Sequence, residues 1–215
     1  MRKDACINRA QDYVKELFEN EFSGHDYWHT MRVFHTASEL AKEEKADLFL
    51  VQLAALLHDV DDVKLSPETS KNKDHAVGFM RENQIDEEHI QIVCRIIDEI
   101  SYKGTDSCVP QTIEGKCVQD ADRLDAIGAI GIGRAFAFGG SHERKMYDPQ
   151  EPPAREMNEV QYRAAKSTTI NHFYEKLFLL KDMMNTKSAR ASAEKRDQLM
   201  RQFVEAFLAE WDGVL

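Results

Sequence analysis

The stretch "DLFLVQLAALLHDVDD", residues 47–62, decides the expected fold. Its first eleven residues are apolar at nearly every position, which predicts a helix buried on all sides at the centre of a helical protein. Asp47 precedes the apolar run and is a suitable N-cap. The helix ends in four polar residues, His58, Asp59, Asp61 and Asp62. Carboxylates buried there need a cation or dense hydrogen bonding.

The rest of the chain also predicts helices. Apolar residues recur at spacings of three and four, and no strand-like alternation extends beyond a few residues. The predicted class is therefore all-α. Besides 47–60, helices are expected over 5–20, 73–84, 86–101, 113–138, about 156–184 and about 191–212. "SGHDYW", 23–28, opens another helix, in which Val33, Ala37, Leu40 and Ala41 share a face.

We expect one domain over residues 1–215. Its core would span about 1–126, and a C-terminal helical layer, about 154–213, would pack over the cleft. The segment "GGSHERKMYDPQEPP", 139–153, has the densest turn signals and is either a mobile loop or the boundary before that layer.

Composition and charge disfavour binding to nucleic acid and to membranes. The net charge is −10, from 28 basic and 38 acidic residues, which disfavours non-specific nucleic-acid binding but not a small phosphorylated substrate. No apolar run approaches the roughly 18–20 residues that span a bilayer, and the N-terminus lacks the apolar stretch of a signal peptide. Four cysteines without a CxxC pair indicate reduced thiols in a cytoplasmic protein.

Further ligand-type residues flank the His58–Asp59 pair. His25 and His29 precede it by about thirty residues, and Asp120, Asp122 and Asp125 follow it by about sixty. Taken alone, the pair fits a metal site and a helix end that reaches solvent equally well. Histidine, then an adjacent His–Asp, then an aspartate, each on a separate helix, is a much narrower pattern and favours a metal.

This order of residues resembles the HD-domain superfamily of metal-dependent phosphohydrolases. A bacterial subfamily of YedJ-like proteins and nucleoside-triphosphate pyrophosphohydrolases is more similar still, and the likeness covers nearly the whole chain. The motifs that carry it are "SGHDYWHTMRV", "AALLHDVDDVK", "ISYKG", "VQDADRLDAIGAIGIGRAF" and "TTINHFYEKLFLLKDMMNT".

The resemblance implies an HD-type helical bundle with additional C-terminal helices. It also implies that one divalent metal ion is held by His29, His58, Asp59 and Asp122. His29 matches the family pattern better than His25, and Asp125 is a candidate to orient a ligand. Mn, Mg, Co, Ni, Fe and Zn all suit such ligands, with Mn or Mg expected for activity.

A single metal is favoured, because "IIDEISYKG" stands where two-metal relatives carry another histidine. His75 is either a substrate contact or a helix cap. Asp62, one turn beyond His58, is the expected proton acceptor, whereas Asp61 is expected to point aside into solvent. Lys64 is expected to assist catalysis, and Lys103 and Arg134 to bind phosphate.

The expected function is hydrolysis of nucleotides, with (deoxy)nucleoside triphosphates cleaved to monophosphate and pyrophosphate. The alternatives are hydrolysis of nucleoside monophosphates or cyclic nucleotides, and a non-catalytic sensor that binds metal and nucleotide. A homodimer is compatible with the sequence, but no apolar stripe requires one.

Overall fold

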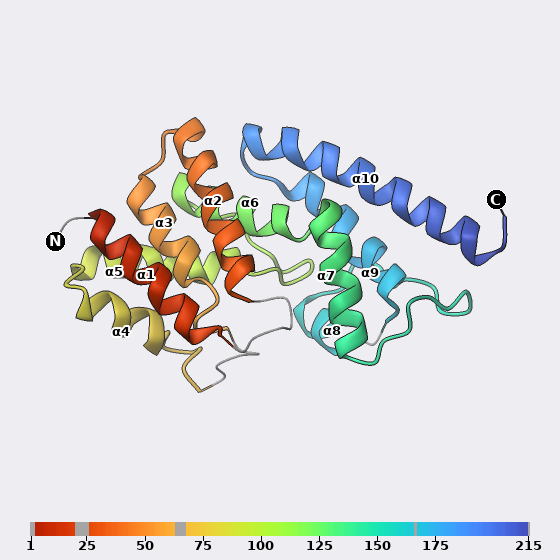
Figure 1. Ribbon diagram of the computed structural model, residues 1–215, viewed down its shortest axis with the longest axis horizontal. Coiled ribbons are helices and arrows are strands. Elements are labelled where there is room, and N and C mark those ends of the chain that lie inside the picture. Colours follow the sequence, from red (N-terminus) through yellow and green to blue (C-terminus); the bar gives the residue numbers. More distant parts are fainter. Residues whose placement is uncertain (1–2, 20–25, 63–67, 166, 215) are drawn as a thin grey trace. The chain divides into compact units, whose positions relative to one another are not determined.

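The computed structural model describes residues 3–19, 26–62, 68–165 and 167–214. Within these ranges the regular elements are all helical, and an isolated bridge between Lys103 and Thr105 is the only β-type pairing, so the predicted all-α class is confirmed (Figure 1). The elements are α1 (Lys3–Leu17), α2 (Tyr27–Glu44), α3 (Leu48–Leu57), α4 (Asp74–Glu82), α5 (Glu87–Ile100), α6 (Ile113–Asp125), α7 (Gly128–Ser141), α8 (Glu159–Ala164), α9 (Thr169–Glu175), the 3₁₀ helix η1 (Leu177–Met183) and α10 (Lys187–Trp211).

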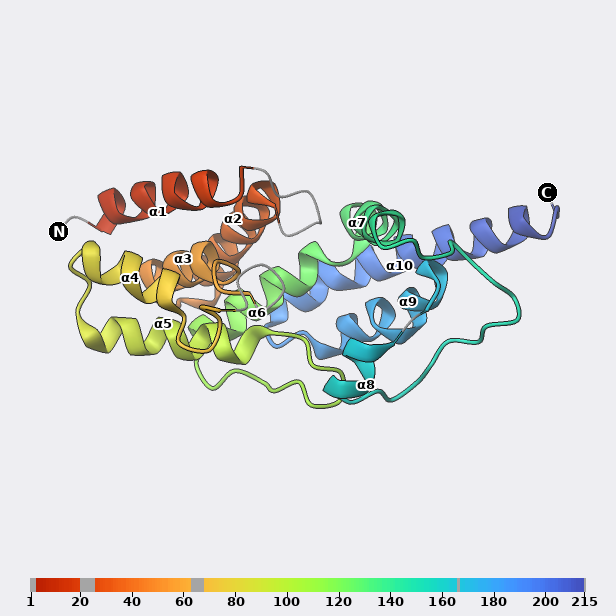
Figure 2. The same cartoon turned by 90° about the horizontal axis from the view of Figure 1, so that it is seen from below.

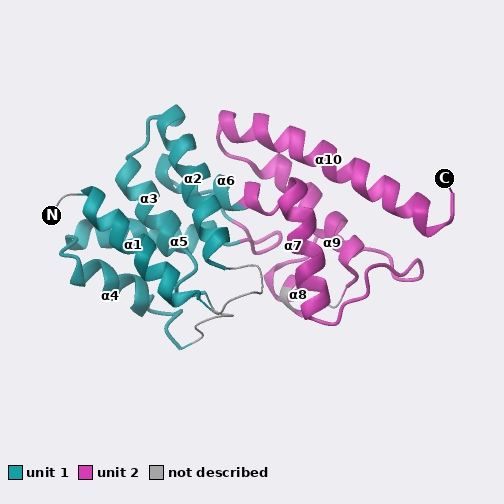
Figure 3. Ribbon diagram, viewed as in Figure 1, with its two compact units in different colours: residues 1–101, 108–122 teal, residues 102–107, 123–215 magenta. Residues whose placement is uncertain are grey.

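The chain packs as two compact units (Figure 3). Unit 1 comprises residues 1–101 and 108–122, and unit 2 comprises residues 102–107 and 123–215. The division between them falls within α6, after Asp122. The expected single HD-type domain remains a prediction.

Helix α3 is the centre of unit 1. It contacts α1, α2 and α5, and it lies between α1 and α5 in Figure 2. Leu53, Leu56 and Leu57 are fully buried, and each such side chain contributes roughly 1.5–3 kcal/mol through removal from water. The side chain of Asp47 accepts hydrogen bonds from two amides of the first turn, which confirms it as the N-cap.

Unit 2 is organised around aromatic side chains. Helix α10 contacts α7 and η1, and α9 contacts η1 and α7. The rings of Phe136, Phe173 and Phe203 lie within 6.4 Å of one another, centroid to centroid, and Phe207 packs at a tilt against Phe136 and Phe203. These contacts join α7, α9 and α10 into one core.

Two of the expected helices are wrong in extent. The expected helix over 156–184 is divided into α8, α9 and η1, because Ala165 is extended and Thr168 starts a new helix by accepting the amide of Asn171 at 3.1 Å. The expected helix over 113–138 breaks at Gly128, whose φ of +77° suits glycine.

Within the described residues, none of the helices is both long and apolar enough to cross a membrane. All four cysteines are present as free thiols, as expected for a protein without a disulfide framework.

Candidate metal centre

Four side chains from three regions of unit 1 converge. His29 lies on α2, His58 and Asp59 follow α3 directly, and Asp122 lies on α6. His29 Nε2 is 3.4 Å from Asp59 Oδ2 and 3.5 Å from Asp122 Oδ1. His58 Nε2 is 3.2 Å and 4.0 Å from the same two oxygens. The four residues expected from the sequence therefore come together.

Local structure places the two histidines. Asp26 is the N-cap of α2, and its Oδ1 accepts the backbone N–H of His29 at 2.7 Å. The ring of His58 lies 2.8 Å, through Nδ1, from the carbonyl oxygen of Ala55. Since a carbonyl only accepts, Nδ1 of His58 carries the proton and donates it. Its Nε2 is thereby directed at the carboxylates, as in metal-bound histidines generally.

Burial and charge oppose each other at His58. His58 is only 7% exposed, and burial alone lowers the pKa of an imidazole. The carboxylates of Asp59 and Asp122 more than offset this effect and raise the pKa of His58 from 6.5 to about 9. A positive charge is therefore favoured at this point of the protein.

The residues present fit a divalent metal. The ligand atoms of His29, His58 and Asp59 all lie within 4.8 Å of one another, in a buried setting. Bonds of about 2.0–2.2 Å to a shared ion place neighbouring ligand atoms roughly 3–4 Å apart, which matches the distances above. The buried Nε2 of His58 makes no aligned hydrogen bond within the described part of the chain, as expected of an atom placed to bind an ion.

Of the two expected catalytic residues, Asp62 and Lys64, the structure describes Asp62. Asp62 is half-buried, and its backbone N–H donates to the carbonyl of Asp59 at 3.0 Å, so the acid follows the ligand within one turn. Lys64 and His25 lie outside the described residues.

The expectation that Asp61 points aside into solvent is wrong. It is 7% exposed rather than solvated, because its carboxylate caps the N-terminus of α4. Oδ1 accepts the N–H of His75 at 3.1 Å, and Oδ2 accepts the N–H of Ala76 at 2.9 Å. Sequence reasoning missed this role, since a cap supplied from more than ten residues away leaves no local signal.

The expected phosphate contacts Lys103 and Arg134 belong to unit 2. The backbone N–H of Lys103 donates to the hydroxyl of Ser107 at 2.8 Å, which closes a tight turn. The guanidinium of Arg134 donates to Asp125 Oδ2 at 2.7 Å. Within unit 2, Asp125 is thus an ion-pair partner of Arg134.

The matched family model is the HD domain, and it covers residues 27–127. The Bacillus subtilis protein YpgQ is 40% identical over all of this chain and 98% of its own length. An HD-superfamily hydrolase from Bacillus thuringiensis is 42% identical with a TM-score of 0.74 over 98% of each chain. The chain therefore belongs to the HD-domain superfamily of metal-dependent phosphohydrolases.

Within that superfamily, its relatives match over their full length. A crystal structure of a Lactobacillus plantarum protein superposes with a TM-score of 0.88 and 39% identity over 99% of this chain and 100% of that one. YpgQ has been crystallised in complex with ADP, and that structure superposes with a TM-score of 0.73 and 34% identity over 95% of this chain and 96% of YpgQ.

Proposed function

We propose that this phosphohydrolase acts on nucleotides and cleaves (deoxy)nucleoside triphosphates to monophosphate and pyrophosphate. The observation that carries the proposal is the convergence of two imidazoles and two carboxylates, with nitrogen–oxygen distances of 3.2–4.0 Å. Asp62 follows the ligand Asp59 within one turn. The ADP complex of YpgQ supports a nucleotide as the ligand class.

His29, His58, Asp59 and Asp122 would hold the metal. When bound, a divalent ion there supplies Lewis-acid stabilisation of phosphate charge and lowers the pKa of water. Asp62 accepts the proton of the attacking water at a carboxylate oxygen. The water oxygen then bonds to the α-phosphorus, the bond from that phosphorus to the bridging oxygen breaks, and pyrophosphate leaves.

The proposal also assigns substrate contacts to cationic and hydrogen-bonding side chains. Lys64 assists catalysis, Lys103 and Arg134 contact phosphate oxygens, and His75 contacts the substrate. Alanine at each of these four positions should raise KM or lower kcat, and a position whose substitution changes neither is not part of the site.

The test is metal-dependent turnover. Metal-stripped protein receives Mn²⁺, Mg²⁺, Co²⁺ or Ni²⁺ and is offered nucleoside mono-, cyclic mono- and triphosphates. We expect pyrophosphate from triphosphates, lost in His58→Ala and Asp59→Ala and kept in His35→Ala, which changes an exposed histidine of α2. Inorganic phosphate from monophosphates, or ring opening of cyclic nucleotides, would replace the proposed substrate.

A second variant, Asp62→Asn, distinguishes an enzyme from a non-catalytic nucleotide sensor. Asp62→Asn should bind nucleotide with unchanged affinity and lower kcat by at least about 100-fold, the usual contribution of a general base. Tight nucleotide binding without product from any substrate in the native protein would support the sensor.

A further inference from the structure

Helix α4 is capped from outside itself. Its own N-cap residue, Lys73, has a left-handed φ of 56° and makes no side-chain cap hydrogen bond. The ammonium of Lys73 is 2.6 Å from Asp98 instead. Asp61, at the end of the segment that carries His58 and Asp59, accepts the amides of the second and third residues of α4 with its two oxygens. The start of α4 is therefore held to the end of the metal-binding segment.

The first of those amides belongs to His75, whose ring is also fixed. Its Nδ1 lies 3.1 Å from the carbonyl oxygen of Val60 and 3.5 Å from Oδ1 of Asp61. Because the carbonyl only accepts, Nδ1 carries the proton when the ring is neutral. Nε2 is then a hydrogen-bond acceptor, and the side chain is 36% exposed.

The ring of His58 is held in the same way, by the carbonyl of Ala55. Two histidines of unit 1 thus have Nδ1 committed to carbonyls of the same segment and Nε2 directed elsewhere. His75 stands outside the group of ligand atoms that lie within 4.8 Å of one another among the described residues. Its Nε2 is therefore not one of the atoms assigned to that ion.

We propose that Asp61 is a positioning residue for the hydrolysis, which holds His75 in the Nδ1–H form so that Nε2 accepts a hydrogen bond from the substrate. The proposal rests on the proposed function, in which His75 contacts the substrate. A carboxylate beside Nδ1 favours the proton on that nitrogen, and the Asp61 side chain is only 3% exposed, so water screens the interaction little.

The chain offers a matched control in Asp86. Its Oδ1 accepts the N–H of His89 at 3.0 Å, and its carboxylate oxygens lie 2.7 and 2.8 Å from Nδ1 of His89. Asp86 thus caps α5 and contacts a histidine as Asp61 does, but on an exposed helix end with no metal ligand adjacent. Asp86→Asn controls for the loss of a carboxylate charge at a helix cap, since asparagine keeps the capping oxygen.

The experiment measures kcat with a nucleoside triphosphate and the ¹⁵N signals of the imidazoles of full-length Asp61→Asn, Asp86→Asn, His75→Gln and the Asp61→Asn/His75→Gln double variant. The signals of His75 are identified by their loss in His75→Gln. We expect Nδ1–H at His75 in the native protein at about pH 8.5, where a free imidazole is neutral, and a mixture of tautomers in Asp61→Asn. We expect kcat to fall roughly 10- to 100-fold in Asp61→Asn and to stay unchanged in Asp86→Asn.

The double variant decides whether Asp61 acts through His75. Equal kcat in the double variant and in His75→Gln supports the proposal, whereas multiplied losses overturn it. Unchanged kcat in folded Asp61→Asn, or native protein with Nε2–H at His75, also overturns it. If the native protein turns over no nucleotide, the proposed function fails, and the tautomer in native protein and Asp61→Asn alone decides whether Asp61 positions the ring.

Discussion

Metal binding should depend steeply on pH, because the ion competes with a proton on His58. In the metal-free protein the pKa of His58 is raised to about 9, so at pH 7 roughly 99% of the rings are protonated. A metal ligand must be neutral imidazole. The apparent affinity at pH 7 should therefore be roughly 100-fold below its value above pH 9, and it should rise about tenfold per pH unit between pH 6 and 8.

The assay is titration calorimetry with Mn²⁺ or Co²⁺ in buffers of differing protonation enthalpy. We expect at least one proton released per metal bound at about pH 7. His89→Gln, which changes a half-buried histidine that contacts Asp86, should show the same release. Affinity independent of pH across this range, with no proton release, would refute the assigned charge state of His58.

The same pKa predicts how the metal-free protein responds to alkali. A group whose pKa is higher in the folded than in the unfolded state stabilises the fold below its unfolded pKa, here 6.5. That contribution is lost as pH rises through about 9. The melting temperature of stripped protein should fall across this window, and the fall should be smaller in His58→Gln.

Four substitutions test the packing of the two units by denaturant unfolding. Phe173→Ala, in the aromatic core of unit 2, should lower the free energy of unfolding by about 3–5 kcal/mol, whereas Tyr174→Ala at the exposed neighbour should cost well under half of that. Gly104→Ala should destabilise unit 2, since φ is +60° and a Cβ would lie 2.0 Å from the carbonyl oxygen of Met157. Asp47→Ala should cost about 1 kcal/mol through loss of the α3 cap.

Gly133→Ala is the control for Gly104→Ala. A Cβ at Gly133 meets nothing within 4 Å, and alanine inside α7 should stabilise by roughly 0.5–1 kcal/mol. Equal effects at both glycines would contradict the close approach of residues 104 and 157. A Phe173→Ala cost below about 1 kcal/mol would contradict the buried ring cluster.

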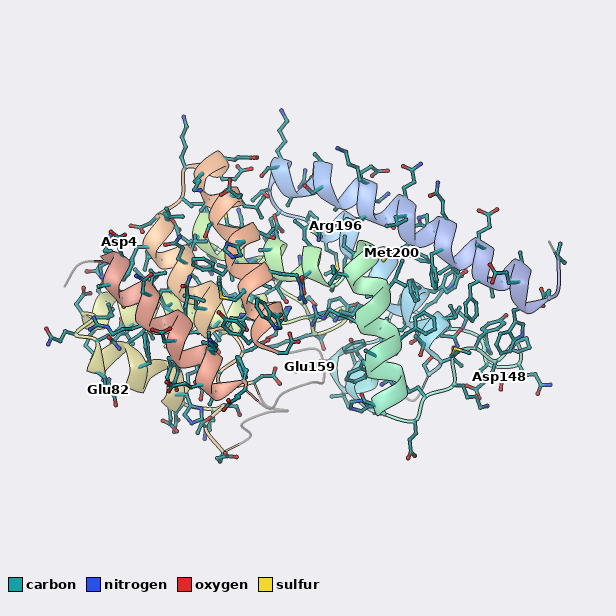
Figure 4. The ribbon with its side chains drawn as sticks, in the orientation of Figure 1. Asp4, Glu82, Asp148, Glu159, Arg196 and Met200 are labelled. Atoms are coloured by element: carbon teal, nitrogen blue, oxygen red, sulfur yellow. The ribbon has the colours of Figure 1, made fainter. Side chains whose placement is uncertain are left out.

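Polar contacts between residues distant in sequence organise the C-terminal unit as well. Arg196, labelled on α10 in Figure 4, donates to the carbonyl of Leu124 and lies against Gly128. The backbone N–H of Glu159, the first residue of α8 and labelled in the same figure, donates to Oδ2 of Asp106 at 3.0 Å. Gly104 and Asp106 thus explain why the "SYKG" turn packs on residues 157–159.

The sequence by itself determined the helical class, the central position of α3 and the four residues expected to hold the metal. The first two features follow from local periodicity and from a helix cap within three residues, and the choice of the four ligands follows from the resemblance to the HD-domain superfamily. The YpgQ relative and the HD-domain match agree with that interpretation.

Only the tertiary structure decided which charges are compensated and where the C-terminal helices end. Asp61 is buried because the amides of a later helix meet it, and Arg134 is paired with Asp125 nine residues earlier. The helix expected over 156–184 is divided because caps and ring contacts within unit 2 outweigh helical propensity. Tertiary contacts decide these outcomes, and the periodicity of the sequence does not predict such contacts.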